Sequence, residues 1–150
     1  MKSSQIHLVI VTPQKKLIDT SVDQVSIPTA MGEITILPHH VPVIAKLQFG
    51  ELLAKKDGED MPFALWGGVA EITGERVTIL ADTAQYAEEI SLEKAEAARK
   101  KAEELMQKKE GVSEEEFAAF AGQLERALAQ ERVAQKYKTK KYRKFSSLEK

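Results

Sequence analysis

Hydrophobic residues follow two different periods along the chain, and the period changes near Ala84. Before Ala84, apolar residues lie in short alternating runs that Gly and Pro interrupt, which is typical of β-strands. After Ala84 there is no Pro, and apolar residues recur every three or four positions, which is typical of amphipathic helices. We therefore predict a β domain over residues 1–84 and a helical domain over residues 85–150.

The β domain should consist of short strands separated by turns. The expected strands share runs of apolar residues bounded by Gly, Pro or Asp, and they fall at residues 6–11, 24–27, 34–37, 43–47, 51–56, 62–66, 69–73 and 76–81. Pro28 should end the second of them, because proline has no N–H to donate to a ladder, and residues 31–33 should form a turn. Short strands at this spacing favour an antiparallel sandwich or barrel.

The helical domain should be a hairpin of two helices. The first is expected to run from Leu92 to about Lys109 with Ser91 as its N-cap, and Gly111 should separate it from the second. Ser113 is followed by three Glu residues, a pattern that predicts a capping box at the start of the second helix. Because the apolar stripe of the first helix is mostly Ala, the hairpin should bury little area and be weakly held.

The apolar stripe of the second helix changes phase near its end. It fails at Glu131 and Arg132 and resumes out of phase at Val133 and Tyr137. We therefore expect this end of the helix to be poorly suited to packing on the chain's own β domain.

Charge is distributed unevenly along the chain. The formal net charge of −1 argues against a dedicated nucleic-acid-binding protein. Residues 1–84 carry 7 basic and 10 acidic side chains, residues 85–135 carry 8 and 12, and residues 136–150 carry 7 and 1, so the net charges are −3, −4 and +6. The basic end fits an acidic protein surface best. Nucleic acid, anionic lipid and a solvated helix end are the alternative explanations.

Composition and motifs indicate no catalytic site. Without Cys there is no disulfide and no thiolate nucleophile, and a reducing compartment is favoured. No apolar run approaches the roughly 18 residues that a membrane-spanning helix needs. His39 and His40 are adjacent, so in an extended segment they should point in opposite directions and not share a metal ion. The sequence contains no Gly-rich phosphate loop and no nucleophile elbow, and we expect no metal site, cofactor or enzymatic activity.

Three motifs follow one another through the β domain. Residues 32–42 read G-E-I-T-I-L-P-H-H-V-P, residues 67–72 read G-G-V-A-E-I, and residues 77–84 read V-T-I-L-A-D-T-A. In this order and at this spacing they resemble the epsilon subunit of F-type ATP synthases, of bacterial or plastid type. The resemblance covers nearly the whole chain and weakens after Thr139.

This resemblance implies a β-sandwich of about ten strands followed by a two-helix hairpin. It implies a non-catalytic subunit of the central rotor stalk of a proton-translocating ATP synthase, whose sandwich binds the gamma subunit and the c-ring. Glu33 and His40 would lie at the rotor contact, and His39 takes the place of a Gly that the family carries there. Membrane association would come only through the complex, at the cytoplasmic face of the bacterial cell membrane, with the plastid thylakoid as the alternative location.

In the family, the helices fold down on the sandwich or extend along gamma. Extended helices would meet acidic loops of the alpha and beta subunits and restrain ATP hydrolysis. The candidate residues share a positive charge, and they are Arg126, Arg132, Lys136, Lys140 and Lys141. The alternative from another class is a free-standing small-ligand-binding sandwich module or hydrolase, with the helices as a lid.

Residues 90–95 differ from a segment through which some bacterial members of the family bind ATP. That segment carries Asp and Arg where this chain has Ser91 and Lys94. Because an Arg fork recognises phosphate differently from a Lys point charge, ATP binding should be weak or absent. The candidate residues for such a site are Ile90, Lys94 and Arg99.

Overall fold

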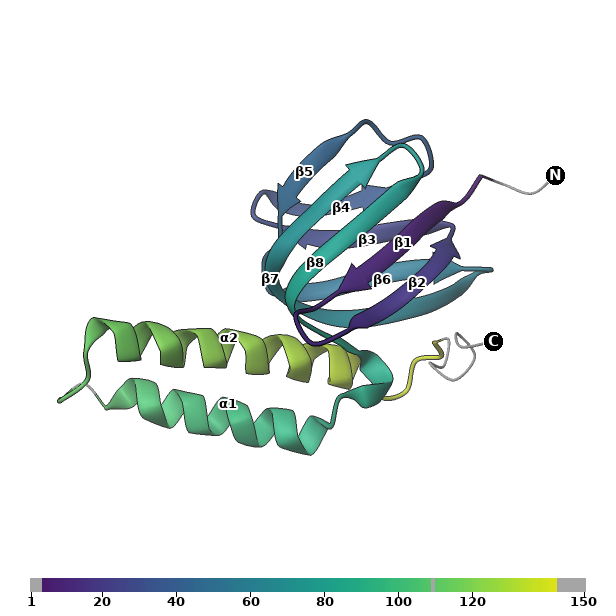
Figure 1. Ribbon diagram of the computed structural model, residues 1–150. Helices are drawn as coiled ribbons and strands as arrows, with labels where there is room; N and C mark the ends of the chain where they lie inside the picture. Colours follow the sequence, from purple (N-terminus) through teal and green to yellow (C-terminus); the bar gives the residue numbers. More distant parts are fainter. Residues whose placement is uncertain (1–3, 109, 143–150) are drawn as a thin grey trace.

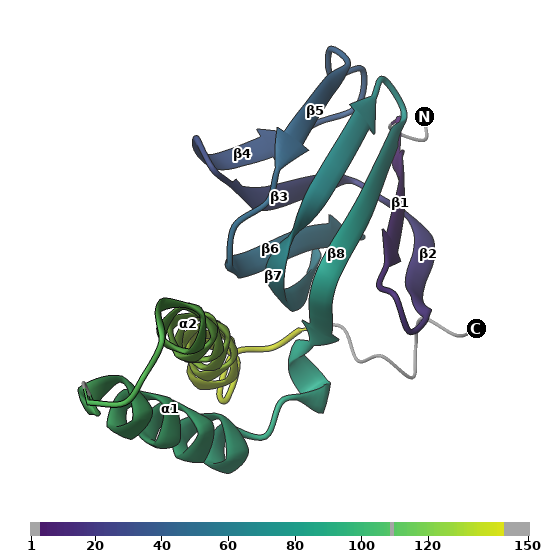
Figure 2. The same cartoon turned by 60° about the vertical axis from the view of Figure 1, so that its left-hand side comes forward.

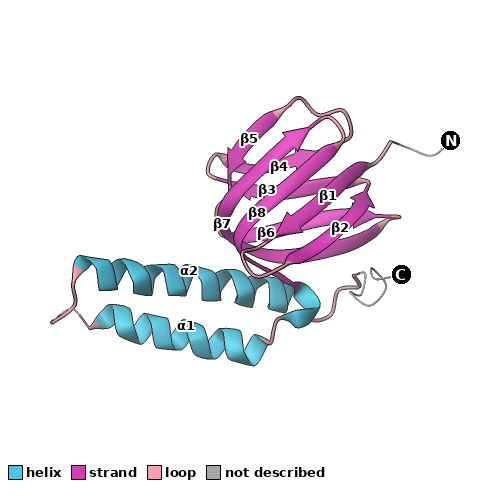
Figure 3. Ribbon diagram, viewed as in Figure 1, coloured by secondary structure: helices cyan, strands magenta, loops and turns pink. Residues whose placement is uncertain are grey.

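The computed structural model describes residues 4–108 and 110–142, which form a folded β-sheet and a pair of helices at one end of it (Figure 1). The elements are β1 (Ile6–Val11), β2 (Lys16–Val22), β3 (Gln24–Thr29), β4 (Gly32–Ile36), β5 (Val43–Lys46), β6 (Gly50–Lys56), β7 (Glu59–Thr73), β8 (Arg76–Tyr86), a short 3-10 turn (Ala87–Glu89), α1 (Leu92–Gln107) and α2 (Glu114–Lys136). The strand order is β2-β1-β8-β7-β6-β3-β4, and β5 also pairs with β7 (Figure 3). All neighbouring strands are antiparallel except β1 and β8, which run parallel.

Strand β7 bends this single sheet into a sandwich. Its first half pairs with β6 and its second half with β5, while β8 pairs with both halves. At the bend, Gly67 and Gly68 have φ values of 68° and 111°, and a Cβ at Gly68 would lie 2.1 Å from the carbonyl oxygen of Leu80. Only glycine fits a backbone that is left-handed and this close to its neighbour. The bend places β3, β4 and β6 in one layer and β1, β5 and β8 in the other (Figure 2).

Alternate residues of the strands fill the space between the two layers. The large side chains that are fully buried include Ile6, Leu8, Ile10, Ile27, Ile36, Leu52, Met61, Phe63, Ile72 and Tyr86. The period of two along the first part of the sequence therefore marks the core-facing positions, as expected. Strand β2 closes the sandwich at its open side, where the Asp23 N–H donates to the carbonyl oxygen of Lys55 at 2.7 Å.

The predicted fold class, a β-sandwich followed by a two-helix hairpin, is confirmed, but the strands differ in detail. The described residues contain eight strands in one sheet, and not about ten. The expected strands at 62–66 and 69–73 are one strand, because β8 pairs with β7 on both sides of the glycine bend. Strand β2 was not predicted, because its buried residues Leu17 and Ile18 are adjacent in the sequence and do not alternate with polar ones.

Two local predictions in the region of β3 and β4 were wrong. Strand β3 does not end at Pro28 but continues to Thr29. It pairs with β6 only as far as Ser26, so the missing N–H of Pro28 removes no ladder bond there. The turn expected at residues 31–33 comes earlier, and Gly32 already belongs to β4. The Thr29 hydroxyl closes this turn by accepting from the Met31 N–H at 3.2 Å.

Both helix starts are confirmed, since each has the predicted serine cap. The Ser91 hydroxyl accepts from the Lys94 N–H at 3.4 Å, and the Ser113 hydroxyl accepts from the Glu116 N–H at 3.1 Å. Helix α1 ends at Gln107, and the expected last residue, Lys109, lies outside the described residues.

The second half of α2 packs on the sandwich, contrary to the prediction from its change of phase. Val133 and Tyr137 are buried in a cluster with Ala64 of β7 and Ala87 of the 3-10 turn. Closer to the middle of α2, the ring of Trp66 lies beside Gly122, where a Cβ would be 3.4 Å from its nearest ring carbon. The residues after the change of phase therefore face the sandwich, while α1 stays beside α2 there, since Arg99 of α1 bonds Glu131 of α2 at 2.7 Å.

Candidate functional site

Glu33 and His40, the predicted rotor-contact residues, lie in β4 and in the loop between β4 and β5, away from the helical pair (Figure 1). The turn before Glu33 is attached to the end of β5, because the Ala30 N–H donates to the carbonyl oxygen of Lys46 at 2.9 Å. His40 lies just before the start of β5. The structure therefore places the two residues at opposite ends of this short strand.

Exposed apolar side chains accompany these two residues between positions 31 and 44. Met31 is 96 % exposed, Ile44 75 % and Val41 71 %, and Leu37 is also exposed. A group of exposed apolar side chains on a small domain is typical of a macromolecular contact surface. The sequence motif gave no sign of this surface, because apolar residues in a strand pattern are ordinarily assigned to the core.

The adjacent histidines have different surroundings. His39 has a φ of 67°, a left-handed backbone conformation that glycine adopts most readily. Its N–H donates to the carbonyl oxygen of Gly74 at 2.7 Å, which attaches the loop to the β7–β8 turn. The His39 ring lies 3.3 Å from the Ser4 hydroxyl, whereas the His40 ring lies 2.7 Å from the carbonyl oxygen of Val41. The loop thus keeps a glycine-like backbone although it carries His39.

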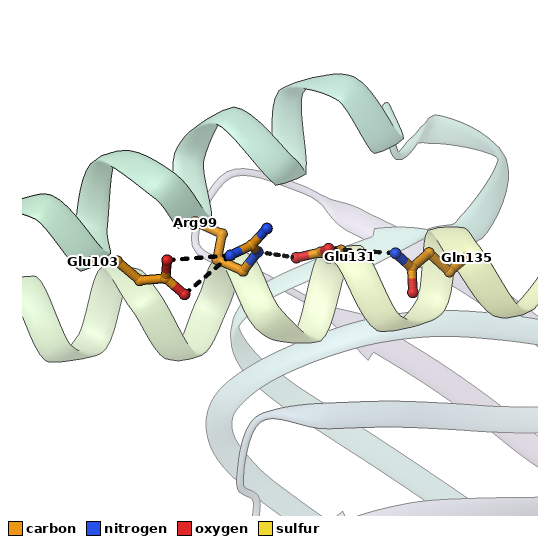
Figure 4. A network of polar contacts seen from close by, with 4 residues as sticks. All are labelled: Arg99, Glu103, Glu131 and Gln135. Atoms are coloured by element: carbon orange, nitrogen blue, oxygen red, sulfur yellow. Dashed lines mark hydrogen bonds and ion pairs between the residues drawn. The ribbon is translucent and has the colours of Figure 1, made fainter.

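Arg99 joins the two helices through a network of charged side chains (Figure 4). Its guanidinium donates to Glu103 of α1 at 3.0 Å and to Glu131 of α2 at 2.7 Å, and Gln135 donates to Glu131 at 3.3 Å. Hydrogen bonds from Arg99, first to Glu103 and then to Glu131, raise the pKa of Arg99 above its usual value. Arg99 is therefore a structural cation between the helices.

A cleft of about 480 Å³ lies between α1, α2 and the end of β8. Of the three ATP candidates, Ile90 and Lys94 line it, and Arg99 does not. Three more charged side chains line the cleft, and they are Lys101 of α1, Arg126 of α2 and Glu89. Lys94 and Lys101 are seven residues apart, about two helical turns, so they lie on one face of α1. This spacing is the feature of the sequence from which the pair could have been predicted.

The five cations predicted to restrain hydrolysis do not form one surface in this structure. Arg126 lines the cleft between the helices, and Arg132 lines a groove beside Glu103 and Glu131. Lys136 pairs with Glu51 of the sandwich at 2.8 Å. The Lys140 amine lies 5.9 Å from the centre of the Tyr137 ring, and Lys141 is exposed.

Glu51 and Tyr137 form a polar contact that the sequence alone did not reveal. The Tyr137 hydroxyl donates to Glu51 at 2.5 Å, although the two residues are 86 positions apart. Tyr137 is only 4 % exposed. Val133 lies one helical turn before Tyr137 and is apolar, and this spacing is the local feature of the sequence that points to a buried Tyr137.

The described part of the chain contains no cluster of three or more His, Cys, Asp or Glu side chains that could hold a metal ion. Among the same residues, no helix is long and apolar enough to span a membrane.

Comparison with known proteins identifies the sandwich first. The family model for the ATP synthase, Delta/Epsilon chain, beta-sandwich domain matches residues 5–87. A structure of the mitochondrial ATP synthase of Euglena gracilis, containing OSCP, F1 and the c-ring, includes a chain with a TM-score of 0.76 and 24% identity, and the match covers 89% of this chain and 83% of that chain. At this identity the match shows a shared fold.

Curated relatives extend the similarity over the helices. The ATP synthase epsilon chain of Geotalea uraniireducens is 39% identical over 134 residues, which cover 89% of this chain and 96% of the relative. The epsilon chain of Herpetosiphon aurantiacus is 43% identical over 129 residues, which cover 86% of this chain and 93% of the relative. Since the sandwich motifs, the helical pair and the sequence match agree over most of both lengths, the chain belongs to the ATP synthase epsilon chain family.

Proposed function

We propose that the protein is a rotor subunit whose sandwich docks on gamma and the c-ring and whose helical pair, α1 and α2, regulates ATP hydrolysis. As an epsilon chain, it is a non-catalytic subunit of the ATP synthase central stalk. The observation that carries this conclusion is the epsilon chain match over both the sandwich and the helices. We assign docking to residues 1–84 and regulation to residues 85–150, although the last strand of the sandwich extends to Tyr86. We also propose that the complex holds the protein at the cytoplasmic face of a bacterial membrane.

The surface between positions 31 and 44 is the proposed rotor contact. Its support is the combination of Glu33 and His40 with the exposed apolar side chains of Met31, Val41 and Ile44. An apolar surface with few charges suits a permanent subunit contact better than a solvent-facing one. Because Glu33 is exposed in β4, changing its charge should leave the sandwich folded.

Charge reversal at Glu33 tests this contact. ATP synthase reconstituted with the Glu33→Lys chain should assemble less well, or should lose coupling between hydrolysis and proton pumping. The matched control is Glu125→Lys, an equal change at an exposed position of α2. Circular dichroism of the isolated chains checks that both variants are folded. If the Glu33→Lys enzyme pumps and synthesises ATP normally, Glu33 does not belong to the rotor contact.

The helical pair is the proposed restraint on hydrolysis. Its support is the high positive charge toward the end of α2, with Arg126, Arg132 and Lys136 on the helix and Lys140 and Lys141 beyond it. Acidic loops of the alpha and beta subunits are the proposed partners when the pair extends. Such an interaction would be screened by salt over a Debye length of about 8 Å at physiological ionic strength.

Truncation tests the restraint directly. An enzyme whose chain ends at Ser113 should hydrolyse ATP faster than the complete enzyme. Replacing Lys140 and Lys141 with Gln should raise hydrolysis partly. Replacing Lys100 and Lys108 of the helical region with Gln is the matched control and should change little. Unchanged hydrolysis in the truncated but fully assembled enzyme would rule out a regulatory role for the helices.

A further inference from the structure

The helical pair is anchored to the sandwich mainly by its last turn. Elsewhere, the buried residues of α2 are the small side chains of Ala127 and Ala129. At the end, Val133 and Tyr137 are large, are 1 % and 4 % exposed, and contact Ala64 and Ala87. Because buried apolar area grows with side-chain size, this last turn contributes more to docking than the alanine-rich part.

Aromatic rings extend this anchor into the core of the sandwich. The rings of Phe63 and Tyr86 are 4.9 Å apart between centroids, those of Tyr86 and Tyr142 are 6.1 Å apart, and those of Tyr142 and Tyr137 are 5.8 Å apart. All three pairs meet edge to face, an arrangement that aromatic quadrupoles favour. The segment after α2 therefore returns to the sandwich and does not continue away from it.

Glu51 of β6 adds a charged contact at the same place. One carboxylate oxygen accepts from the Tyr137 hydroxyl at 2.5 Å, and the other accepts from the Lys136 amine at 2.8 Å. The Glu51 side chain is only 15 % exposed, so its charge is largely removed from water. A carboxylate in this situation needs both donors, because an unpaired charge at a buried position is unfavourable.

We propose that Glu51, Tyr137 and Lys136 form a latch that holds the helical pair on the sandwich and opens before the pair can reach another subunit. This inference rests on the proposed regulatory function and adds a contact within the subunit that controls when the helices are released. Lys136 pairs with Glu51 here, so it is not available to an acidic partner until the latch opens. The sandwich carboxylate therefore competes with the partner's carboxylates for the same cation, and it disfavours the extended, inhibitory arrangement.

The absence of cysteine from the chain allows a direct test with the isolated, full-length subunit. Ala129→Cys introduces one thiol at a buried position of α2 that faces Trp66 and Thr83 of the sandwich. Ala54→Cys introduces one inside the sandwich core and reports unfolding of the sandwich instead. Alkylation by iodoacetamide then proceeds at a rate proportional to the fraction of molecules that are open at each position.

Glu51→Gln and Tyr137→Phe should each raise the alkylation rate at the Ala129→Cys position by about tenfold or more, as expected for loss of a charge-assisted hydrogen bond. The double variant should raise the rate by less than the product of the two single effects, since Glu51→Gln removes the charge that strengthens this bond and Tyr137→Phe removes its donor. The rate at the Ala54→Cys position should not change. Glu71→Gln, an equal change of charge at an exposed position of β7, is the control and should leave both rates unchanged. An unchanged rate at the Ala129→Cys position in both latch variants would overturn the latch.

Hydrolysis by the assembled enzyme separates this inference from the function on which it rests. Opening the latch with Glu51→Gln should strengthen inhibition and lower ATP hydrolysis, whereas truncation at Ser113 should raise it. If truncation raises hydrolysis and Glu51→Gln leaves it unchanged, the competition for Lys136 is overturned while the regulatory role stands. If alkylation is faster but truncation has no effect on hydrolysis, the latch stands and the regulatory role fails.

Discussion

The fold changes the ionisation of Tyr137, which is buried at the end of α2. Burial, followed by the hydrogen bond to Glu51, raises the pKa of its hydroxyl well above the usual value of 10.0, and the charge of Asp60 adds to the effect. The docked helical pair therefore contains neutral tyrosine.

Docking of the helices should weaken as the pH rises above about 10. Below the usual pKa of 10.0, Tyr137 is neutral in both the docked and the open form, so its contribution to docking is fully present. Above that pH, only the open form ionises, and each pH unit should shift the equilibrium toward opening by about tenfold.

The measurement is the alkylation rate at the Ala129→Cys position divided by the rate at an exposed Ala98→Cys position. The Tyr137→Phe chain should show a smaller pH dependence. Equal profiles for the two chains would show that another group controls docking at high pH.

At the scale of the elements, α1 and α2 form a charged cleft without the arrangement that recognises phosphate bidentately. Lys94, Lys101 and Arg126 converge there, but Glu89 reduces the positive charge. The Ser91 hydroxyl caps α1, and Arg99 is paired with two glutamates outside the cleft. The helices thus provide charge complementary to an anion without a dedicated fork.

ATP should therefore bind weakly, or not at all, to the isolated subunit at physiological concentrations. Isothermal titration calorimetry measures this directly. The double variant Ser91→Asp and Lys94→Arg introduces the residue types found in nucleotide-binding members of the family and should bind ATP more tightly than the natural chain. Micromolar affinity in the natural chain would contradict the prediction. It would show that the three cations of the cleft are enough to bind ATP tightly.

At the scale of the whole molecule, the sandwich and the helical pair have separate cores. The main core draws its buried residues from the sandwich, and among the described residues after β8 only Tyr142 packs against it. The smaller cluster at the end of α2 connects the two parts through Ala64 and Ala87. Removing the helices would expose this cluster but leave the main core intact.

A chain ending at Glu89 should therefore fold alone. It keeps Tyr86, which is fully buried in the main core, and the 3-10 turn that follows β8. Circular dichroism should show β structure, and thermal melting should be cooperative, at a somewhat lower temperature than for the complete chain because Ala64 loses its cover. A disordered fragment, compared with the complete chain in the same buffer, would show that the helices are part of the folding unit.

Local sequence determined the features that depend on near neighbours. The alternation of apolar residues gave most strands, and the serine caps gave the starts of both helices, because each feature is satisfied within a few residues. The motifs around Glu33, Gly67 and Val77 indicated the family before any long-range contact was considered. Their order and spacing agree with the epsilon chain match over most of the chain.

Only the tertiary structure decided how these elements meet. Pro28 remains inside a strand because the pairing of β3 with β6 ends at Ser26, and α2 packs on the sandwich because its change of phase turns Val133 and Tyr137 toward Ala64. The contact between Glu51 and Tyr137 joins positions 86 residues apart. No periodicity reports such a pair, because its free energy depends on burial and on the path of the chain through space. The sequence by itself therefore determined the family and the elements, and the packing of distant side chains decided how the helices are held.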